Sequence, residues 1–414
     1  MLNIFYDSYR ILTHVYSEQA FIKQAINSEI IEPLNKNSVI KICYGVVDKD
    51  IELEYIISQL CSKRPKLPIR ILLKISIYCI KYLQKAPYAV TDSAVELCKK
   101  LGKSGMSGFL NAILRKYIKS PNLPLPKNEI ESLSIKYSYP AFAVKELIND
   151  YGKNLAEEIM QYDLPYTFLR FDSSVNGEDY LKDLNKEYIE TPFKNCYALK
   201  NFTRDDGFFE GKYTIQSIGS VAICNVVESG ESLLDCCAAP GGKSVALANK
   251  FKNITACELH PHRANLIVDY ANRMKVNNIT VKTQDATQFN EEFLNQFDTI
   301  LCDAPCSGFG VTKENPDIKL NRQEENISEL SKLQLKILKN VSNYLKKGGY
   351  LYYSTCSIFN KENDCVIKEF LKSSNFKVMQ ISSPLAHLKT EFGLQFLPNI
   401  SMSAGFYICK LQKL

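Results

Sequence analysis

Two cysteines stand where predicted buried strands end. One strand runs into Asp303-Ala304-Pro305-Cys306-Ser307-Gly308, and another runs into Ser354-Thr355-Cys356-Ser357. The chain has 14 cysteines but no Cys-x-x-Cys pair and no secretory signal, so most are expected to be small, buried, reduced residues and no metal site is expected. Cys306 and Cys356 differ because Ser and Gly in predicted turns flank them. A thiol at a strand end, near helix N-termini, can have a lowered pKa and act as a thiolate.

A glycine-containing loop follows another predicted strand. Its sequence is Cys237-Ala238-Ala239-Pro240-Gly241-Gly242-Lys243, and a predicted helix comes directly after it. Gly241 and Gly242 permit a tight turn and the close approach of a ligand, and the first turn of the helix offers free backbone N–H groups. Ligands of parallel sheets bind at the carboxyl ends of strands, so this loop is predicted to bind one.

Three interpretations of the loop compete. A P-loop would need glycine where Cys237 stands, and the Gly-x-Gly-x-x-Gly fingerprint of dinucleotide sites is absent. The third interpretation is a nucleoside-type ligand such as S-adenosylmethionine, which has no phosphates. Glu258 ends the next predicted strand, where a carboxylate can accept hydrogen bonds from ribose hydroxyls, and Asp285 follows the third strand, near where an adenine edge would lie. Together these residues favour S-adenosylmethionine.

Two thiols, a carboxylate and a methyl donor suit the methylation of carbon 5 of a pyrimidine. Carbon 5 is a poor nucleophile until a thiolate adds to carbon 6, which is covalent catalysis. A base must then remove the proton from carbon 5 so that the thiol can leave. One cysteine would be the nucleophile and the other would assist release, while Asp303 would hydrogen-bond the pyrimidine edge. Spacing alone does not say which cysteine has which role.

These segments resemble the signature segments of the Sun-type RNA cytosine-5 methyltransferases. The N-terminal part is similar to the Nus-type antitermination-factor domain of the bacterial small-subunit methyltransferase B branch, and Leu169-Arg170-Phe171 resembles the strand that precedes the family's catalytic domain. The N-terminal resemblance rests on Pro87-Tyr88-Ala89-Val90, Ala94-Val95-Glu96-Leu97 and Gly108-Phe109-Leu110-Asn111-Ala112-Ile113-Leu114-Arg115.

The resemblance implies roles for individual residues. Cys356 would be the nucleophile, and Cys306 would help to release the product. The cofactor would lie against residues 237–243 and the carboxylates of Glu258, Asp285 and Asp303.

Two segments depart from the family's pattern. Gln216-Ser217-Ile218-Gly219-Ser220 stands where the family usually has Gln-Asp-x-Ala-Ser, and Ala404-Gly405-Phe406-Tyr407 stands where Asp-Gly-Phe-Phe is usual. Neither segment is expected to touch the thiols or the cofactor loop. The departures leave open the hydrogen bonding around the site and the choice of nucleotide.

Periodicity predicts the elements that position these residues. Apolar residues recur at helical spacing over 5–118, with one helix starting near Thr91-Asp92-Ser93, and three prolines follow between 121 and 126. Residues 130–165 are again helical. After residue 230, short apolar runs alternate with helical patterns, which predicts βαβ units. The predicted strands are 168–175, 233–237, 254–258, 279–283, 299–303 and 350–354, and the helices among the last five are 244–250 and 327–345.

We therefore predict a multidomain chain. An all-α, antitermination-factor-like RNA-binding domain spans residues 1–120 and a proline-rich linker spans 121–130. A helical and small α+β connecting domain spans 131–225. A Rossmann-like α/β methyltransferase domain with a mostly parallel, doubly wound sheet spans 226–414.

Composition and charge limit the remaining choices. Hydrophobic residues make up 45% of the 414 residues and charged residues 23%, and no apolar run is long enough to cross a membrane, which indicates a globular cytoplasmic protein, by default a monomer. Residues 1–130 carry 19 Lys and Arg against 11 Asp and Glu, whereas the remainder is close to neutral. Such a basic segment suits a polyanion, and Lys63, Arg64, Lys66, Arg70 and Lys74 form the best local phosphate patch. A plain solvated surface is the alternative.

The leading hypothesis is an enzyme that methylates one cytosine of 16S (small-subunit) ribosomal RNA. The fully assembled ribosome is not the expected substrate, and naked RNA and an assembling subunit are both left open. The target base would be unpaired or flipped, because carbon 6 is out of reach in a stacked helix. The same chemistry on transfer RNA or on another ribosomal cytosine is one alternative. A non-catalytic RNA-binding protein with a vestigial methyltransferase fold is the other.

Overall fold

The chain forms two compact units in this computed structural model, which describes residues 1–200 and 202–414. The first unit comprises residues 1–161 and 312–322, and the second comprises residues 162–311 and 323–414. The backbone therefore passes between the units after residues 161, 311 and 322. Within the described ranges, the helices are all too short or too polar to cross a membrane.

Helices build the first unit around one central helix, α5 (Leu67–Lys81), in which residues 71–79 are buried without a break. A helix that is apolar on all sides must be covered on all sides. The helices that pack on α5 are α1 (Leu2–Glu18), α3 (Lys36–Asp48), α4 (Asp50–Leu60), α6 (Pro87–Lys100) and α7 (Ser107–Lys119). The unit also contains α2 (Ile22–Asn27), α8 (Glu129–Tyr137), α9 (Ala141–Gln161) and the short α15 (Ile318–Asn321).

Two local expectations for this unit had different outcomes. Residues 120–128 form neither helix nor strand, as the prolines predict. The helix start near Thr91 is wrong, because α6 already begins at Pro87, a residue well suited to a first helical turn. Thr91 lies inside the helix, and its Oγ1 donates a hydrogen bond of 2.8 Å to the carbonyl oxygen of Pro87 instead of capping.

A four-stranded antiparallel sheet opens the second unit. Its order is β2-β3-β1-β4, and its strands are β2 (Ile189–Glu190), β3 (Cys196–Leu199), β1 (Thr167–Phe171) and β4 (Tyr213–Ile215). The strand predicted over 168–175 ends early, at Phe171. The Asp172 carboxylate accepts hydrogen bonds from the N–H and the hydroxyl of Ser174, which turns the chain.

The large sheet has the order β11-β12-β13-β9-β8-β5-β6-β7, and β10 (Phe376–Met379) also pairs with β13. The five strands from β9 to β7 are mutually parallel, which confirms the predicted sheet. These are β9 (Leu345–Thr355), β8 (Phe297–Asp303), β5 (Gly230–Asp235), β6 (Phe251–Glu258) and β7 (Ile279–Thr283); the antiparallel strands are β11 (Leu388–Lys389), β12 (Leu394–Phe396) and β13 (Phe406–Lys413).

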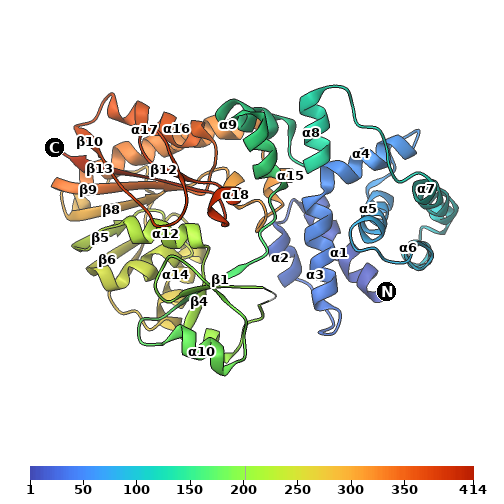
Figure 1. Cartoon of the computed structure of the whole chain (residues 1–414), viewed down its shortest axis with the longest axis horizontal. Coiled ribbons are helices and arrows are strands. Elements are labelled where there is room, and N and C mark those ends of the chain that lie inside the picture. The colour runs from blue at the N-terminus through green and yellow to red at the C-terminus, as the bar shows by residue number, and fades with distance from the viewer. Residues whose placement is uncertain (201) are drawn as a thin grey trace. The chain divides into compact units, whose positions relative to one another are not determined.

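Helices cover both faces of the large sheet (Figure 1). Leu233 and Leu301 pack in one core with α12 (Ile218–Val226), whereas their neighbours Leu234 and Ile300 pack in another with α16 (Glu324–Val341) and α17 (Asp364–Leu371). Successive side chains of a strand point to opposite faces, so an uninterrupted apolar run requires two covers. Helices α13 (Gly242–Leu247) and α14 (Pro261–Arg273) follow β5 and β6.

Candidate active site

A cavity of about 370 Å³ lies at the carboxyl ends of the parallel strands. The strand order reverses between β5 and β8, and doubly wound sheets bind their ligands at such a switch point. The predicted site residues on its wall are Cys237, Ala239, Glu258, Asp285, Asp303, Cys306 and Cys356. Residues from five separate strand ends therefore meet at one cavity.

The rest of the predicted cofactor loop does not line this cavity; these residues are Ala238, Pro240, Gly241, Gly242 and Lys243. Gly241 has a φ of 100°, which favours glycine, and an added Cβ would lie 3.2 Å from Ile267 of α14. The turn and the packing against α14 thus explain why residue 241 is glycine, without any contact with a ligand.

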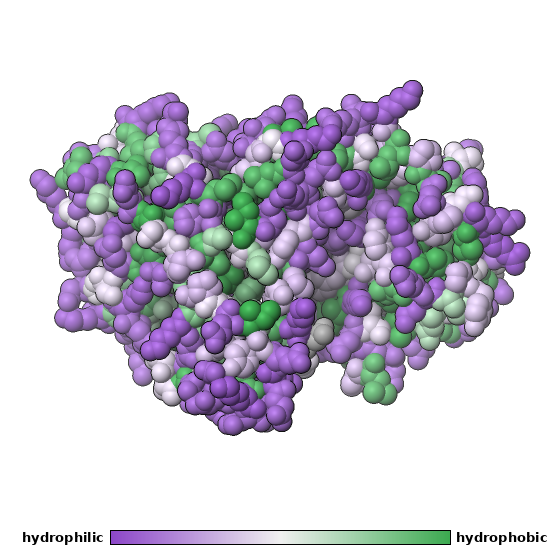
Figure 2. Space-filling model, in the orientation of Figure 1, coloured by the Kyte–Doolittle hydropathy of each residue, from purple (hydrophilic) through white to green (hydrophobic). Residues whose placement is uncertain are grey.

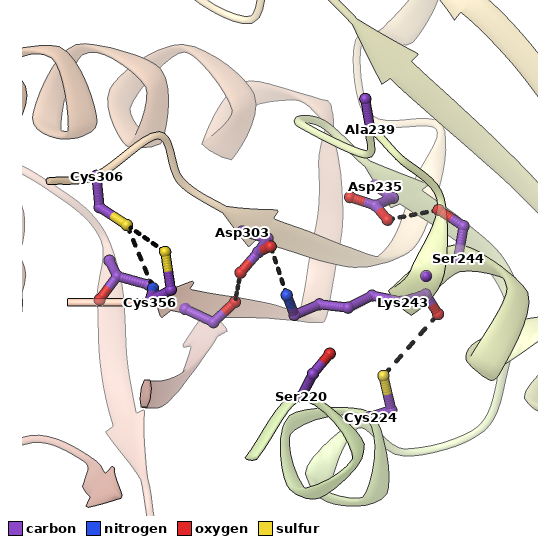
Figure 3. Close-up of polar contacts among 12 residues, drawn as sticks. Ser220, Cys224, Asp235, Ala239, Lys243, Ser244, Asp303, Cys306 and Cys356 are labelled. Atoms are coloured by element: carbon purple, nitrogen blue, oxygen red, sulfur yellow. Dashed lines mark hydrogen bonds and ion pairs between the residues drawn. The ribbon is translucent and has the colours of Figure 1, made fainter. Parts of the chain in front are cut away.

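Lys243 and Asp303 form an ion pair beside the cavity (Figure 3). The Lys243 Nζ lies 2.5 Å from Asp303 Oδ2, and the Ser354 hydroxyl donates to Asp303 Oδ1 at 2.7 Å. Burial lowers the pKa of Lys243, but the Asp303 carboxylate outweighs burial and raises that pKa above its usual range, so the ammonium stays charged. Lys243 therefore acts on the site through Asp303.

The two other predicted acids are held by their own local turns. Glu258 is buried, and its Oε1 accepts the His260 N–H at 3.2 Å and lies 3.3 Å from Arg263 Nη1. The Asp285 carboxylate accepts the Thr287 N–H at 2.8 Å. Both carboxylates are thus oriented before any ligand binds. His260 also lines the cavity.

Asp235 ends β5 beneath the loop. Its Oδ2 accepts a hydrogen bond of 2.6 Å from the Ser244 hydroxyl, whereas its Oδ1 is buried without a partner among the described residues. Burial raises the pKa of Asp235 to about 7. This carboxyl group is therefore poised to gain or lose a proton near neutral pH.

The two thiols face each other. Cys306 Sγ lies 3.0 Å from Cys356 Sγ, and the Cys356 backbone N–H donates to Cys306 Sγ at 3.3 Å (Figure 3). The hydrogen bond with Cys356, together with burial, raises the pKa of Cys306 well above that of a free thiol. The expectation of a lowered pKa is thus wrong for Cys306, because a second thiol and a dry environment outweigh any helix terminus.

Sequence reasoning missed the residue that joins the two thiol loops. Glu362 is fully buried, and its carboxylate accepts hydrogen bonds from Ser307 and Ser357, the residues that directly follow the two cysteines. It belongs to a polar run that resembles a solvated turn, so neither periodicity nor composition indicates its burial. The serine after each cysteine is the only signal that could have indicated a shared partner.

The two segments that differ from the family's pattern, residues 216–220 and 404–407, both touch the site, contrary to expectation. The Gln216 side chain donates to the carbonyl oxygen of Gly242 at 3.2 Å and accepts from Arg170 Nε at 2.7 Å. The Gly405 N–H donates to the Gly310 carbonyl at 2.7 Å, and the Gly310 N–H donates to the Cys356 carbonyl at 2.9 Å. The first segment thus supports the cofactor loop, and the second supports the Cys356 loop.

The predicted phosphate patch of the helical unit is wrong in part. Lys74 is buried and lies 2.5 Å from Asp50 and 2.7 Å from Glu54, and Arg70 lies 3.2 Å from Glu54. These two cations neutralise internal acids, so they do not face solvent as a patch. Lys63, Arg64 and Lys66 remain exposed.

Family models match both parts of the chain. Residues 222–412 match the model described as 16S rRNA methyltransferase RsmB/F, and residues 8–119 match the NusB family. The chain is 33% identical to the probable ribosomal RNA small subunit methyltransferase B of Bacillus subtilis, over 95% of this chain and 94% of that one. The chain belongs to the ribosomal RNA small subunit methyltransferase B family. A relative from Pasteurella multocida with the same name is 32% identical over 90% of this chain and 87% of its own.

Solved structures share the fold. The crystal structure of PH0851 superposes with a TM-score of 0.82 at 23% identity, over 98% of both chains. NSun6 from Pyrococcus horikoshii, solved with SFG, superposes with a TM-score of 0.61 at 18% identity, over 67% of this chain and 99% of that one. At these identities the likeness concerns the fold alone.

Membership of the methyltransferase B family confirms the predicted resemblance, the methyltransferase fold and S-adenosylmethionine as the cofactor. The cavity residues fit that group. The carboxylates of Glu258, Asp285 and Asp303 suit hydroxyl, amine and sulfonium groups, and the side chains of Leu259, Leu333 and Ile337 supply apolar walls for an adenine ring.

Proposed function

We propose that this protein transfers a methyl group from S-adenosylmethionine to carbon 5 of a cytosine in small-subunit ribosomal RNA. The pair of thiols, 3.0 Å apart on the wall that also carries Glu258 and Asp285, is the observation that supports this proposal. A methyltransferase that acts on a ring nitrogen, an amine or a hydroxyl needs no cysteine pair. A carbon nucleophile that must first be activated by thiol addition needs one thiol to add, and a second thiol beside it is placed to assist release.

Cys356 is the nucleophile in this proposal, and its Sγ adds to carbon 6 of the cytosine. The Cys306 thiol stabilises the Cys356 thiolate by donating a hydrogen bond, since its own raised pKa keeps it protonated. Addition makes carbon 5 nucleophilic, and the bound cofactor supplies an electrophilic methyl group. The carbon 5 proton then passes to a water molecule as the bond between carbon 6 and the Cys356 sulfur breaks, and the Cys306 thiol assists this release by donating a hydrogen bond to the departing thiolate.

The remaining site residues bind the cofactor and orient the cytosine in this proposal. Asp303 hydrogen-bonds the pyrimidine edge, and Lys243 and Ser354 hold its carboxylate in position. Glu258 binds the ribose hydroxyls of the cofactor, and Asp285 lies by its adenine. Residues 237–243 form the cofactor loop, although within it only Cys237 and Ala239 line the cavity.

The basic helical unit binds the RNA phosphates in this proposal, which supplies affinity without base specificity. Its exposed Lys63, Arg64 and Lys66 are available for that contact. On the face shown in Figure 2, hydrophilic residues surround small apolar groups. We assign the protein to the cytoplasm as a monomer that acts on small-subunit ribosomal RNA outside the fully assembled ribosome.

The test uses radiolabelled S-adenosylmethionine, the purified chain and unmodified small-subunit ribosomal RNA, followed by mapping of 5-methylcytosine. Cys356→Ala should abolish methyl transfer and leave cofactor binding nearly intact, because only the nucleophile is removed. Cys306→Ala should accumulate a covalent protein–RNA adduct, because release is blocked after methylation.

Each outcome has a definite meaning. Label on one cytosine of this RNA supports the reaction and identifies its target. Label on transfer RNA alone keeps the chemistry and changes the substrate. Full activity in Cys356→Ala, with loss and no adduct in Cys306→Ala, would reverse the roles of the two cysteines. Absence of both labelling and cofactor binding would instead favour a non-catalytic RNA-binding protein.

A further inference from the structure

Glu362 is a fully buried carboxylate outside the cavity wall. It lies in a short turn between β9 and α17, and four hydrogen bonds surround its two oxygens. Oε1 accepts the Ser307 N–H at 2.8 Å and the Gln334 amide at 3.1 Å. Oε2 accepts the hydroxyls of Ser307 and Ser357, each at 2.5 Å.

The serines on this carboxylate directly follow the two cysteines, Ser307 after Cys306 and Ser357 after Cys356. The first loop leaves β8 and the second leaves β9, and the two serine hydroxyls are 3.4 Å apart. One side chain therefore bonds both thiol-bearing loops on the side away from the cavity. A buried carboxylate with fully occupied oxygens allows little displacement, because each lost hydrogen bond leaves a buried charge less solvated.

We call Glu362 with Ser307 and Ser357 the Glu362 clamp. Further hydrogen bonds hold Glu362 itself in place. The Tyr353 hydroxyl donates to the Glu362 backbone carbonyl at 2.6 Å, and the Gln334 amide also donates to the Pro305 carbonyl at 3.0 Å. The clamp is thus anchored to β9, to α16 and to the loop just before Cys306.

We propose that Glu362 is a positioning residue that sets the separation of the Cys306 and Cys356 sulfurs. Its consequence for methyl transfer rests on the function proposed above, whereas its effect on the thiols does not. Two thiols on separate loops stay 3.0 Å apart only if the loops cannot slide past each other. Glu362 touches neither thiol, so its influence is exerted through Ser307 and Ser357.

Two substitutions of Glu362 separate the effect of its hydrogen bonds from the effect of its charge. In Glu362→Gln the amide oxygen still accepts from the Ser307 N–H and from Gln334, and the amide nitrogen donates to the two serine hydroxyls, which can rotate to accept. Glu362→Ala removes all four bonds. Ser357→Ala removes one of these four bonds, together with the hydrogen bond of 3.2 Å that the Ser357 hydroxyl accepts from the Phe359 N–H. It is a milder test in case Glu362→Ala does not fold. If positioning is the role, the glutamine variant retains it and the alanine variant loses it.

Asp364 provides a matched control two residues away. It is also a buried carboxylate, and it accepts hydrogen bonds from the Thr390 hydroxyl, the Glu391 N–H and the Tyr407 hydroxyl. Tyr407 pairs with Thr355 in the strand that precedes Cys356, but none of these three hydrogen bonds is made by a residue of either thiol loop. Asp364→Ala should therefore lower the stability of the second unit without changing the approach of the two sulfurs.

The first measurement is disulfide formation between Cys306 and Cys356 in the full-length chain, driven by the thiol oxidant diamide and followed by peptide mass spectrometry. We expect Glu362→Ala to slow this coupling about tenfold and Ser357→Ala to slow it less, because coupling requires both sulfurs in contact geometry. Glu362→Gln and Asp364→Ala should match the native chain. Native-like coupling in both Glu362→Ala and Ser357→Ala, or equal slowing in Asp364→Ala, would overturn the proposal.

The second measurement is the single-turnover rate of methyl transfer with saturating RNA and cofactor. A displaced nucleophile should lower this rate about 100-fold in Glu362→Ala, with cofactor affinity unchanged and activity retained in Glu362→Gln. Unchanged turnover in Glu362→Ala would overturn the proposal as it applies to catalysis. If the native chain methylates no RNA while Glu362→Ala still slows thiol coupling, the proposed function fails and the positioning role stands.

Discussion

Individual cysteines in this chain differ mainly through their surroundings. Burial raises the pKa of Cys79 and of Cys257 to about 12, so these thiols are inert packing residues. For Cys306 the first cause of the raised pKa is the neighbouring thiol, and burial comes second. In the function proposed above, Cys306 and Cys356 are the reactive pair among the 14 cysteines, and the thiol that each one faces distinguishes them from Cys79 and Cys257.

Asp235 gives a prediction at this scale. Its folded pKa of about 7 is raised by burial, so its contribution to stability is full below about pH 4 and is lost as the pH rises through 7. Asp235→Asn removes this dependence. The free energy of unfolding of the native chain, relative to that of the variant, should fall by about 2 kcal/mol between pH 5 and pH 8. Urea denaturation at each pH measures it, and parallel profiles for the two proteins would contradict the assignment.

At the scale of elements, the site depends on close approach between loops. An added Cβ at Gly310 would lie 2.1 Å from the Gly405 carbonyl oxygen and 2.7 Å from that of Cys356. The segment after the Cys306 loop, the Cys356 loop and the start of β13 therefore meet where only a hydrogen atom fits. This contact explains a glycine that no turn conformation requires.

Gly310→Ala should consequently displace the Cys356 loop. We expect a loss of stability of about 2–4 kcal/mol, measured by denaturation, and a loss of methyl transfer beyond what the stability change explains. Gly108→Ala is the control, since nothing lies within 4 Å of an added Cβ there and the residue sits in helix α7. It should be neutral or stabilising by about 0.5–1 kcal/mol. Native stability in Gly310→Ala would show that these loops give way easily.

At the scale of the whole molecule, residues 312–322 belong to the helical unit although the chain on either side belongs to the methyltransferase unit. Within the helical unit, the buried Lys319 Nζ lies 2.6 Å from the Asp48 carboxylate, and the Ile22 N–H donates to Asp317 at 3.4 Å. Tyr139 and Thr312 share a hydrogen bond of 2.9 Å. The segment begins six residues after Cys306, so the helical unit holds the stretch of chain that follows the Cys306 loop.

Asp48→Asn tests that anchor. Burial lowers the pKa of Lys319 to about 8, so at neutral pH its ammonium still needs the carboxylate. Removing the partner of a buried charge should destabilise the helical unit by about 3 kcal/mol and speed hydrogen exchange of the amides of residues 312–322. Lys23→Met removes an exposed hydrogen bond to Asn315 and one cation near Asp317, but it leaves the pair of Asp48 and Lys319 intact and should change both quantities much less. Unaltered exchange in Asp48→Asn would show that the segment is held by other contacts.

The sequence alone determined the bounds of several strands and the sheet edge at which the candidate site residues meet. Strand 279–283 has the predicted bounds, and the ends of β6 and β8 at Glu258 and Asp303 do too, because uninterrupted apolar runs and the turn residues after them are local signals. The parallel sheet then brings the strand ends to one edge, so Cys306, Cys356 and the cofactor acids could be placed together without a structure.

Only the tertiary structure decided which polar residues are buried and with whom. Glu362 and Ser307 are 55 positions apart, and Lys319 and Asp48 are 271 apart, so no local pattern links them. The predicted phosphate patch was wrong in part for the same reason. In the sequence Lys74 resembles a surface lysine, and only folding brings Asp50 and Glu54 against it. A buried charge is stabilised by partners that folding alone brings near, and a linear sequence does not state those pairings.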